Sequence, residues 1–295
     1  INNNTLFSAG EVKRLGFTAA DNVAIPDEYL SNLEFVIMRT CHGIGDWCLI
    51  SSMPRLLKSK YPNCKVLIPS SIMMKSIFGS MLNQWGYGTY DSSLITQDIF
   101  KNNQYTEEVF HDHYRIYDDS NDEIPLVEQM LKFWQFKDED IIDSTPDIFF
   151  SKEEIEKGKE LIASYENFGY INVSSTYGST ADSNLLLDKI KEYGDINWFY
   201  YGEKALKETN LNFIKNYVEV KPMNLSIREQ MYIKTQAKVN VGNETGMMLW
   251  GAKYSETYVL GNKVYGSNHG GKNEGKPRKR PFKSGNFVKK VNYLR

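Results

Sequence analysis

The sequence predicts an α/β protein with two Rossmann-like domains and mainly parallel sheets, and three observations support this prediction. Short apolar runs alternate with segments of helical periodicity, which is typical of βαβ units. The chain has 295 residues, about the length of two domains. The alternation forms two series separated near residue 165. We therefore expect domains at residues 1–165 and 166–295, with a cleft between them.

The first series begins with a strand at 35–39, followed by a helix at 47–60 and a strand at 65–68. Apolar residues recur in the helix with a period of 3.6, which indicates one buried face. Pro54 would remove an interior hydrogen bond, so it predicts a kink or a later helix start. The remaining expectations are helices at 71–83 and 123–135, short strands and loops at 86–122, and a connecting segment at 137–150.

The sequence contains two capping boxes, in which a serine and a glutamate three residues later satisfy each other's backbone amides. They begin at Ser151 and Ser226 and predict helices at 151–166 and 226–237. The other expected elements are strands at 170–173, 196–201, 217–220, 238–241 and 257–260, and helices at 182–193, 204–215 and 246–252.

The composition excludes several classes of protein. A net charge of −2 gives no general attraction to nucleic acid. No apolar run reaches the ~20 residues that cross a bilayer. Three cysteines without CxxC spacing argue against a disulfide framework or a zinc site. We expect a cytoplasmic protein, with peripheral association with a membrane as an alternative.

The most informative motif is Gly-Ile-Gly-Asp at 43–46, which begins four residues after the end of the first expected strand. Ligands of open α/β sheets bind at the carboxyl ends of strands, beside helix N-termini. Gly43 and Gly45 would permit a tight turn and a close ligand approach. Asp46 is then either a helix N-cap or a general base. A dinucleotide fingerprint would need glycine where Cys48 stands, so NAD binding is disfavoured.

This turn, a following helix and Lys-Tyr-Pro at 60–62 resemble the start of heptosyltransferase-type (family 9) glycosyltransferases. Val-Gly-Asn-Glu-Thr-Gly at 241–246 is similar to the family's V-G-N-D-T-G loop. Leu-Ser-Ile-Arg-Glu at 225–229 matches its L-S-x-x-E helix start. The matching pieces span most of residues 35–262.

The resemblance implies a GT-B fold, with the acceptor on the first domain and the donor on the second. It implies inverting, metal-independent transfer from a nucleotide diphosphate-sugar, with an ADP-sugar favoured, to a carbohydrate or glycolipid acceptor. No cofactor and no nucleic-acid partner are expected. In this family Asp46 would be the general base, and Glu244, Thr245 and Gly246 would hold the donor diphosphate.

Further donor-side candidates stand at the ends of expected strands. Ser175 and Thr176 could donate hydrogen bonds to phosphates, although a plain surface loop is as good an interpretation. Glu203, after Gly202, could hold the ribose hydroxyls. Met223 could line a pocket for the base, although a methionine there is more often part of the core.

Histidines and acidic residues offer other interpretations. His42 adjoins the glycine turn and could contact the acceptor, or be a plain loop residue. His111 and His113 would point to one side of a strand, but no third ligand is near, so a metal site is disfavoured. Asp-Glu-Asp at 138–140 is similar to the DxD metal motif, but it does not end a buried strand and predicts a solvated loop.

Three departures from the family pattern keep alternatives open. Glu244 replaces an aspartate, Leu249 replaces a frequent histidine, and the loop at 174–184 contains no lysine or arginine. One alternative is a nucleotide-sugar epimerase of the same fold, and another is an inactive GT-B-like protein that binds a sugar or nucleotide. The basic tail from residue 272 is either solvated or supplies Arg278 or Arg280 in place of the missing lysine.

Overall fold

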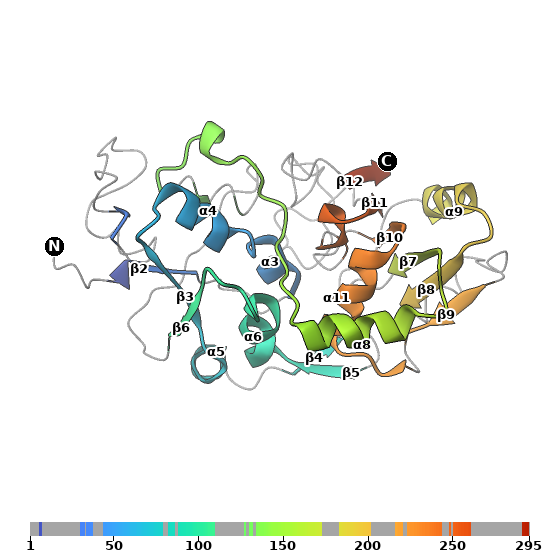
Figure 1. Cartoon of the computed structure of the whole chain (residues 1–295), viewed down its shortest axis with the longest axis horizontal. Helices are drawn as coiled ribbons and strands as arrows, with labels where there is room; N and C mark the ends of the chain where they lie inside the picture. Colours follow the sequence, from blue (N-terminus) through green and yellow to red (C-terminus); the bar gives the residue numbers. More distant parts are fainter. Residues whose placement is uncertain are drawn as a thin grey trace, which may run out of the picture. The chain divides into compact units, whose positions relative to one another are not determined.

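The computed structural model describes residues 6–7, 30–32, 34–37, 44–78, 82–85, 88–109, 127, 130–131, 134–172, 183–201, 216–220, 223–243, 248, 250–260 and 291–294. The chain divides into two compact units. The first unit comprises Ile1–Asn83 and Tyr90–Phe149, and the second comprises Gln84–Thr89 and Phe150–Arg295. Each unit has its own parallel sheet (Figure 1). An acceptor domain at 1–165 and a donor domain at 166–295 stay predictions.

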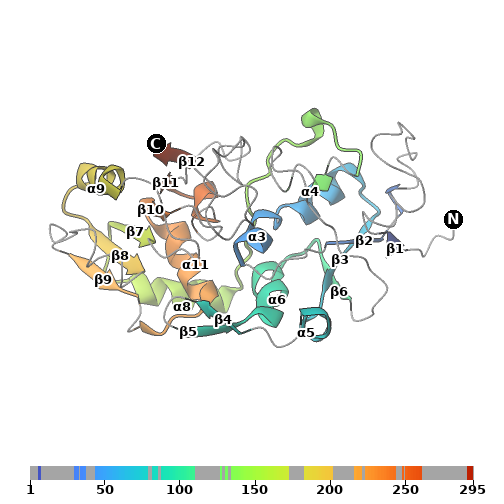
Figure 2. The same cartoon turned by 180° about the vertical axis from the view of Figure 1, so that it is seen from behind.

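The first unit contains a four-stranded parallel sheet of order β1-β2-β3-β6. The strands are β1 (Leu6–Phe7), β2 (Glu34–Val36), β3 (Lys65–Pro69) and β6 (Glu107–Val109). Figure 2 shows α5 (Ser71–Phe78) and α6 (Ile95–Phe100) beside β3 and β6. The expected βαβ start is confirmed because β2 and β3 pair in parallel and the segment between them along the chain is helical.

The single helix expected at 47–60 is two helices, α3 (Ile44–Leu49) and α4 (Met53–Lys60). Pro54 lies in the first turn of α4, where its missing amide leaves no internal hydrogen bond unmade. The later helix start that Pro54 predicted is thus confirmed for α4.

Strand β4 (Leu82–Trp85), helix α6 and the 3-10 turn before α6 were not predicted. Strand β4 overlaps the end of the helix expected at 71–83 and pairs as a separate two-stranded sheet with β5 (Gly88–Asp91), which falls among the short strands and loops expected at 86–122. Helix α6 follows a 3-10 turn, η1 (Ser92–Leu94), and buries Ile95, Ile99 and Phe100. Of the helix expected at 123–135, only residues 127, 130 and 131 are described as helical.

The second unit contains a six-stranded parallel sheet of order β12-β11-β10-β7-β8-β9. Read from β9 and numbered by position in the chain, this is the 3-2-1-4-5-6 arrangement of a doubly wound Rossmann sheet. The Rossmann-like prediction is therefore confirmed for this unit. The strands are β7 (Phe168–Asn172), β8 (Asn197–Tyr201), β9 (Tyr217–Glu219), β10 (Val239–Asn243), β11 (Glu256–Leu260) and β12 (Val291–Leu294).

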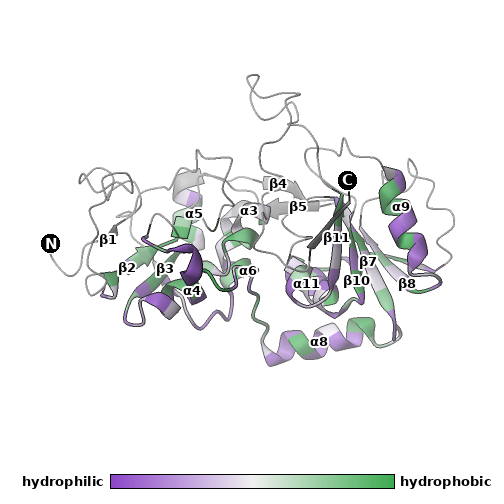
Figure 3. Ribbon diagram, turned by 90° about the horizontal axis from the view of Figure 1, so that it is seen from above, coloured by the Kyte–Doolittle hydropathy of each residue, from purple (hydrophilic) through white to green (hydrophobic). Residues whose placement is uncertain are grey.

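Helices cover both faces of this sheet, as Figure 3 shows for α9 (Ser183–Glu192) and α11 (Ile227–Gln236). Successive residues of β8 point to opposite faces, so Trp198 and Tyr200 pack in the cluster with α9. Phe199 and Tyr201 pack in the cluster with α11. β8 reads as an almost continuous run of aromatic residues because both of its faces are buried.

Both capping boxes are present. Ser151 caps α8 (Lys152–Ile162) and Ser226 caps α11, each accepting from the amide of the glutamate three residues on. The two helices pack against each other, and a Cβ on Gly158 would lie 2.2 Å from the Tyr232 ring. A glycine is therefore required at this crossing.

The remaining expectations have mixed outcomes. Strand β12 was not predicted within the basic tail, and residues 261–290 lie outside the described part. The helix expected at 204–215 also lies outside it. Near 246–252 the structure has a helical Met248 and a 3-10 helix, η5 (Trp250–Lys253). No helix within the described ranges is long and apolar enough to cross a membrane.

Candidate functional site

Asp46 lies in the first turn of α3, as the third residue of that helix. The interpretation of Asp46 as the N-cap is therefore wrong, and Gly45 belongs to the helix rather than to the preceding loop. The helix begins early because Ile44, Trp47 and Cys48 are buried with helical spacing. His42 and Gly43 lie outside the described residues.

Two buried serines hold the junction after α3 against the segment that ends the first unit. Ser51 Oγ donates to Cys48 O at 2.7 Å and accepts from Asp147 N at 2.9 Å. Ser52 Oγ donates to Ser144 O at 3.1 Å. These bonds are buried, so they fix the end of the helix that carries Asp46.

An ion pair reinforces this attachment. Arg55 Nε donates to Asp147 Oδ2 at 2.7 Å, and Arg55 Nη2 donates to Asp143 O at 2.9 Å. The Asp147 side chain is 2% exposed, so its charge requires such a partner. Hydrogen bonds and an ion pair thus attach α3 and α4 to residues 143–147 within the first unit.

The second unit has its topological switch point between β7 and β10, the strands from which the sheet winds in two directions. Gly242 pairs with Asn172 near the carboxyl ends of both strands. A Cβ on Gly242 would lie 2.0 Å from the carbonyl oxygen of Asn172, so the two backbones approach closely here. Doubly wound sheets bind ligands just beyond such a point.

Four neighbouring strands, in the order β10-β7-β8-β9, precede the predicted donor-side residues. All are parallel, so their carboxyl ends meet at one edge of the sheet. The candidates that follow them along the chain are Glu244, Thr245 and Gly246 after β10, Ser175 and Thr176 after β7, Gly202 and Glu203 after β8, and Met223 after β9. The segments that carry the donor-side candidates therefore all begin at one edge of the sheet. Of these candidates, only Met223 lies among the described residues.

Met223 is half-buried and packs against the apolar cluster of Phe168, Phe199 and Val220. Its amide donates to Val220 O at 3.2 Å, in the turn that follows β9. This packing agrees with the core interpretation of Met223, and contact with a base stays a prediction.

Sequence reasoning missed two buried amides at the switch point. Asn172 and Asn243 end β7 and β10 and are 4% and 9% exposed. A buried asparagine requires hydrogen-bond partners, unlike the apolar residues before it. For Asn172 the available signal was a polar residue at the last position of an otherwise apolar strand, whereas β10 also contains Asn240 and gave no such signal for Asn243.

The acidic motif at 138–140 is a 3-10 turn, η2 (Asp138–Asp140), and not the end of a strand, which confirms the loop prediction. Asp140 Oδ2 accepts from Lys60 Nζ at 2.6 Å, and this hydrogen bond lowers the pKa of the Asp140 carboxyl. His111 and His113 lie outside the described residues. Within the described ranges, no three His, Cys, Asp or Glu side chains gather as a metal site would require.

No protein-family model and no curated protein sequence matches the chain. Among solved structures, the chain is similar to a glycosyl transferase family 9 from Veillonella parvula DSM 2008, at 10% identity and a TM-score of 0.51. The match covers 89% of this chain and 85% of that one.

Two structures of the E. coli heptosyltransferase WaaC also match, one with ADP-2-deoxy-2-fluoro heptose and one with ADP. The first has 10% identity and a TM-score of 0.39, over 80% of this chain and 91% of that one. The second has 9% identity and a TM-score of 0.38, over 79% and 88%. The V. parvula likeness confirms the expected fold, and the chain has the GT-B-type α/β fold of a family 9 glycosyltransferase.

Proposed function

We propose that the chain is an inverting, metal-independent glycosyltransferase that uses a nucleotide diphosphate-sugar, first of all an ADP-sugar. The acceptor would be a hydroxyl of a carbohydrate or glycolipid. The observation that carries this proposal is the strand order of the second unit, where β10, β7, β8 and β9 end at one edge and precede every donor-side candidate. Such an edge is where doubly wound sheets bind nucleotides.

On the donor side, Glu244, Thr245 and Gly246 would surround the diphosphate beyond β10. The leaving diphosphate gains negative charge in the transition state, and backbone amides together with the Thr245 hydroxyl would stabilise it. Close approach of a phosphate to a backbone is favoured by Gly246. Ser175 and Thr176 beyond β7 would add hydroxyl donors to the same group.

On the acceptor side, Asp46 would act as the general base. Its carboxylate would take the proton of the acceptor hydroxyl while that oxygen attacks the anomeric carbon, and the diphosphate would leave from the opposite face. His42, Gly43 and Gly45 would lie against the acceptor. Anchoring of the α3–α4 junction by Ser51 and Ser52 supports this role, because a base must be held in place.

The test begins with thermal shifts in ADP-, GDP-, UDP- and CMP-sugars, since a bound donor stabilises the fold by mass action. With the donor identified, Asp46→Asn should keep the thermal shift and lower turnover by about 10²–10⁴-fold. Asp188→Asn is the matched control, because Asp188 is exposed and pairs with Lys191 on α9.

Each result has a distinct meaning. Near-normal turnover of Asp46→Asn would refute Asp46 as the base. An isomerised donor without transfer would favour an epimerase, and binding without any turnover would favour a protein that has lost catalysis. Full activity after removal of divalent metals with EDTA is expected, and loss of activity would contradict metal independence.

A further inference from the structure

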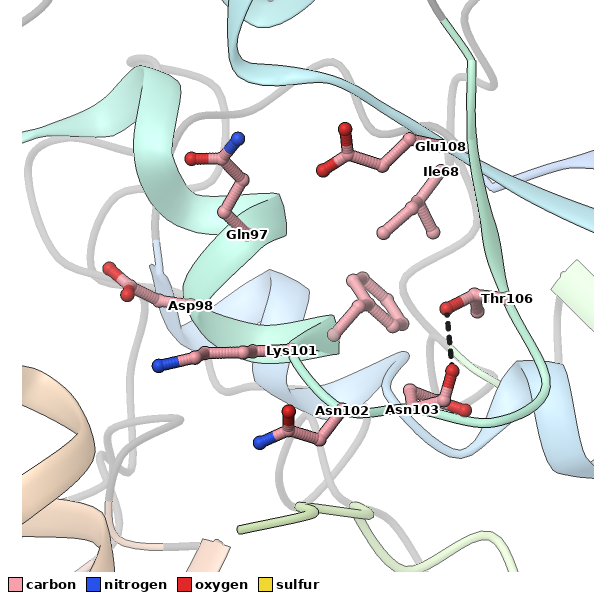
Figure 4. Close-up of a pocket in the computed structure, with 9 residues that line it drawn as sticks. Ile68, Gln97, Asp98, Lys101, Asn102, Asn103, Thr106 and Glu108 are labelled. Atoms are coloured by element: carbon pink, nitrogen blue, oxygen red, sulfur yellow. Dashed lines mark hydrogen bonds between the residues drawn. The ribbon is translucent and has the colours of Figure 1, made fainter. Parts of the chain in front are cut away.

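The first unit contains a cavity of about 540 Å³ beside α6 and the edge strand β6 (Figure 4). Its apolar lining comes from Ile68 and Phe100, which are both buried. The volume falls within the range of about 300–1,000 Å³ that is typical of small-molecule sites. None of the predicted site residues lines this cavity.

Polar side chains make up the rest of the lining, and most are uncharged. They are the amides of Gln97, Asn102 and Asn103, the hydroxyl of Thr106, the carboxylates of Asp98 and Glu108, and the ammonium group of Lys101. Two carboxylates against one cation disfavour a phosphate or another anion. Amides and carboxylates together suit a ligand whose groups both donate and accept hydrogen bonds, as sugar hydroxyls do.

Two polar groups of the lining are available to a ligand. Gln97 and Glu108 face each other, from α6 and from β6 (Figure 4). Neither side chain forms a hydrogen bond or an ion pair in the part of the chain that the structure describes. Binding a ligand between them would therefore break no interaction among the described residues.

The opposite side of the cavity is held in place by the chain itself. Thr106 Oγ1 donates to Asn103 O at 3.2 Å (Figure 4). Asn103 Oδ1 also accepts from Tyr105 N at 3.0 Å. Asn102 has a φ of 62°, a left-handed conformation that asparagine adopts more easily than most residues. A preformed wall of this kind lowers the entropy cost of binding.

One side chain that lines the cavity, Phe100, packs against the helix that carries Asp46. The ring of Phe100 packs edge-on against Trp47, with ring centroids 6.4 Å apart and planes at 86°. Trp47 directly follows Asp46 in α3. A ligand in the cavity would thus contact a side chain that supports α3, within the unit proposed to bind the acceptor.

We infer that this cavity is a subsite for a neutral sugar residue of the acceptor, beyond the residue that receives the transferred sugar. The inference rests on the proposed function. The C–H face of the sugar ring would pack on Ile68 and Phe100, and its hydroxyls would bond to Gln97, Asn103 and Glu108.

The test uses saturation-transfer NMR on the full chain with the methyl glycosides of glucose, galactose, mannose and N-acetylglucosamine as probes. N-acetylneuraminic acid serves as an anionic probe and ADP as a competitor. Glu108→Ala and Gln97→Ala should each weaken binding of the best neutral glycoside at least about fivefold, the loss of roughly 1 kcal/mol expected for one hydrogen bond. Melting temperatures verify that the variants fold.

Glu107→Ala is the matched control, because adjacent residues of a strand point to opposite faces and Glu107 does not line the cavity. It should leave glycoside binding unchanged. Absence of saturation transfer to every neutral glycoside would overturn the inference. So would binding that Glu108→Ala leaves intact, preference for the anionic sugar, or displacement of the glycoside by ADP.

The subsite and the proposed function fail separately. If the glycoside binds as expected but no nucleotide-sugar supports transfer, the subsite stands and the proposed function fails. If transfer occurs and Glu108→Ala leaves the acceptor KM unchanged, the proposed function stands and the subsite fails.

Discussion

Replacement of Gly242 by alanine is the sharpest test of the switch point in the second unit. A Cβ at this position would lie 2.0 Å from the Asn172 carbonyl oxygen and 3.0 Å from Met248 Sδ. Ordinary van der Waals contact begins only at 3.4 Å. Because the first obstacle is backbone of the paired strand, no side-chain rotation relieves it.

The expected loss of stability follows from the hydrogen bonds that pair β7 with β10. To admit the methyl group, β7 and β10 must separate by about 1 Å, which takes neighbouring N–H···O=C bonds beyond the usual ~3.2 Å limit. Weakening about two such bonds costs about 2 kcal/mol, and overpacking adds about 1 kcal/mol or more. We expect a loss of about 3 kcal/mol, or about 6–12 °C in the melting temperature of the second unit.

Scanning calorimetry measures this effect, with Gly194→Ala as the comparison. Gly194 has a φ of 65° and open space around its Cβ position, so alanine there meets only backbone strain of about 1 kcal/mol. A Gly242→Ala protein whose stability lies within about 0.5 kcal/mol of the parent would refute the predicted close approach of the strands.

Three further predictions concern other parts of the chain. Glu154→Ala should cost about 2–4 kcal/mol, because Arg228 donates to Glu154 at 2.7 and 2.9 Å and would keep a buried charge without that partner; urea unfolding measures the loss. Burial raises the pKa of the Cys64 thiol to about 11, so iodoacetamide at pH 8 should not modify Cys64 in the folded protein, as peptide mapping would show. The hydrogen bond from Lys60 lowers the pKa of Asp140, so the stability that this pair adds is present above about pH 4 and is lost as the pH falls through the folded-state pKa of Asp140. When the free energy of unfolding is measured against pH, Asp140→Asn should therefore show a smaller fall on the acid side.

Each of these has a clear contrary result. The double variant Glu154→Ala/Arg228→Leu should recover part of the lost stability, and a further loss would contradict the buried-charge argument. Rapid native labelling of Cys64 would contradict its burial. An unchanged fall on the acid side in Asp140→Asn would show that the Lys60–Asp140 pair adds nothing to stability.

The sequence predicted the long apolar strands well because burial on both faces leaves an unbroken signal. The strand expected at 65–68 is β3 (Lys65–Pro69), and the one expected at 257–260 is β11 (Glu256–Leu260). Both capping boxes also marked helix starts correctly, since their hydrogen bonds are local.

Elements that depend on distant partners were not predicted. Helix α6 has six residues, too few for a periodic pattern, and is stabilised by burial of Ile99 and Phe100. Strand β12 exists through pairing with β11, which no local pattern reveals. At Asp46, capping preference suggested a helix boundary, but burial of Ile44 moved the start of α3 earlier.

The candidate site was likewise predictable only where its signals are local in the sequence. Motif spacing could identify loops after strands, whereas the order β10-β7-β8-β9 that joins their starts is a tertiary property. Asn172 was overlooked because it looked like one more residue of the strand expected at 170–173, and Asn243 because it fell in the loop expected after the strand at 238–241. Cavity residues such as Gln97 and Glu108 carry no sequence signal, since they come from different elements.

The central place of β7 has a consequence for how the second unit folds. As the chain is made, β7 can pair early with β8, which in turn pairs with β9, but the other edge of β7 stays open until β10 is made. During that interval the edge of Phe168–Asn172, buried at every position in the finished sheet, is an apolar template for pairing with other chains. We therefore expect refolding of this unit to be limited by the β7–β10 pairing, and aggregation to compete at that step.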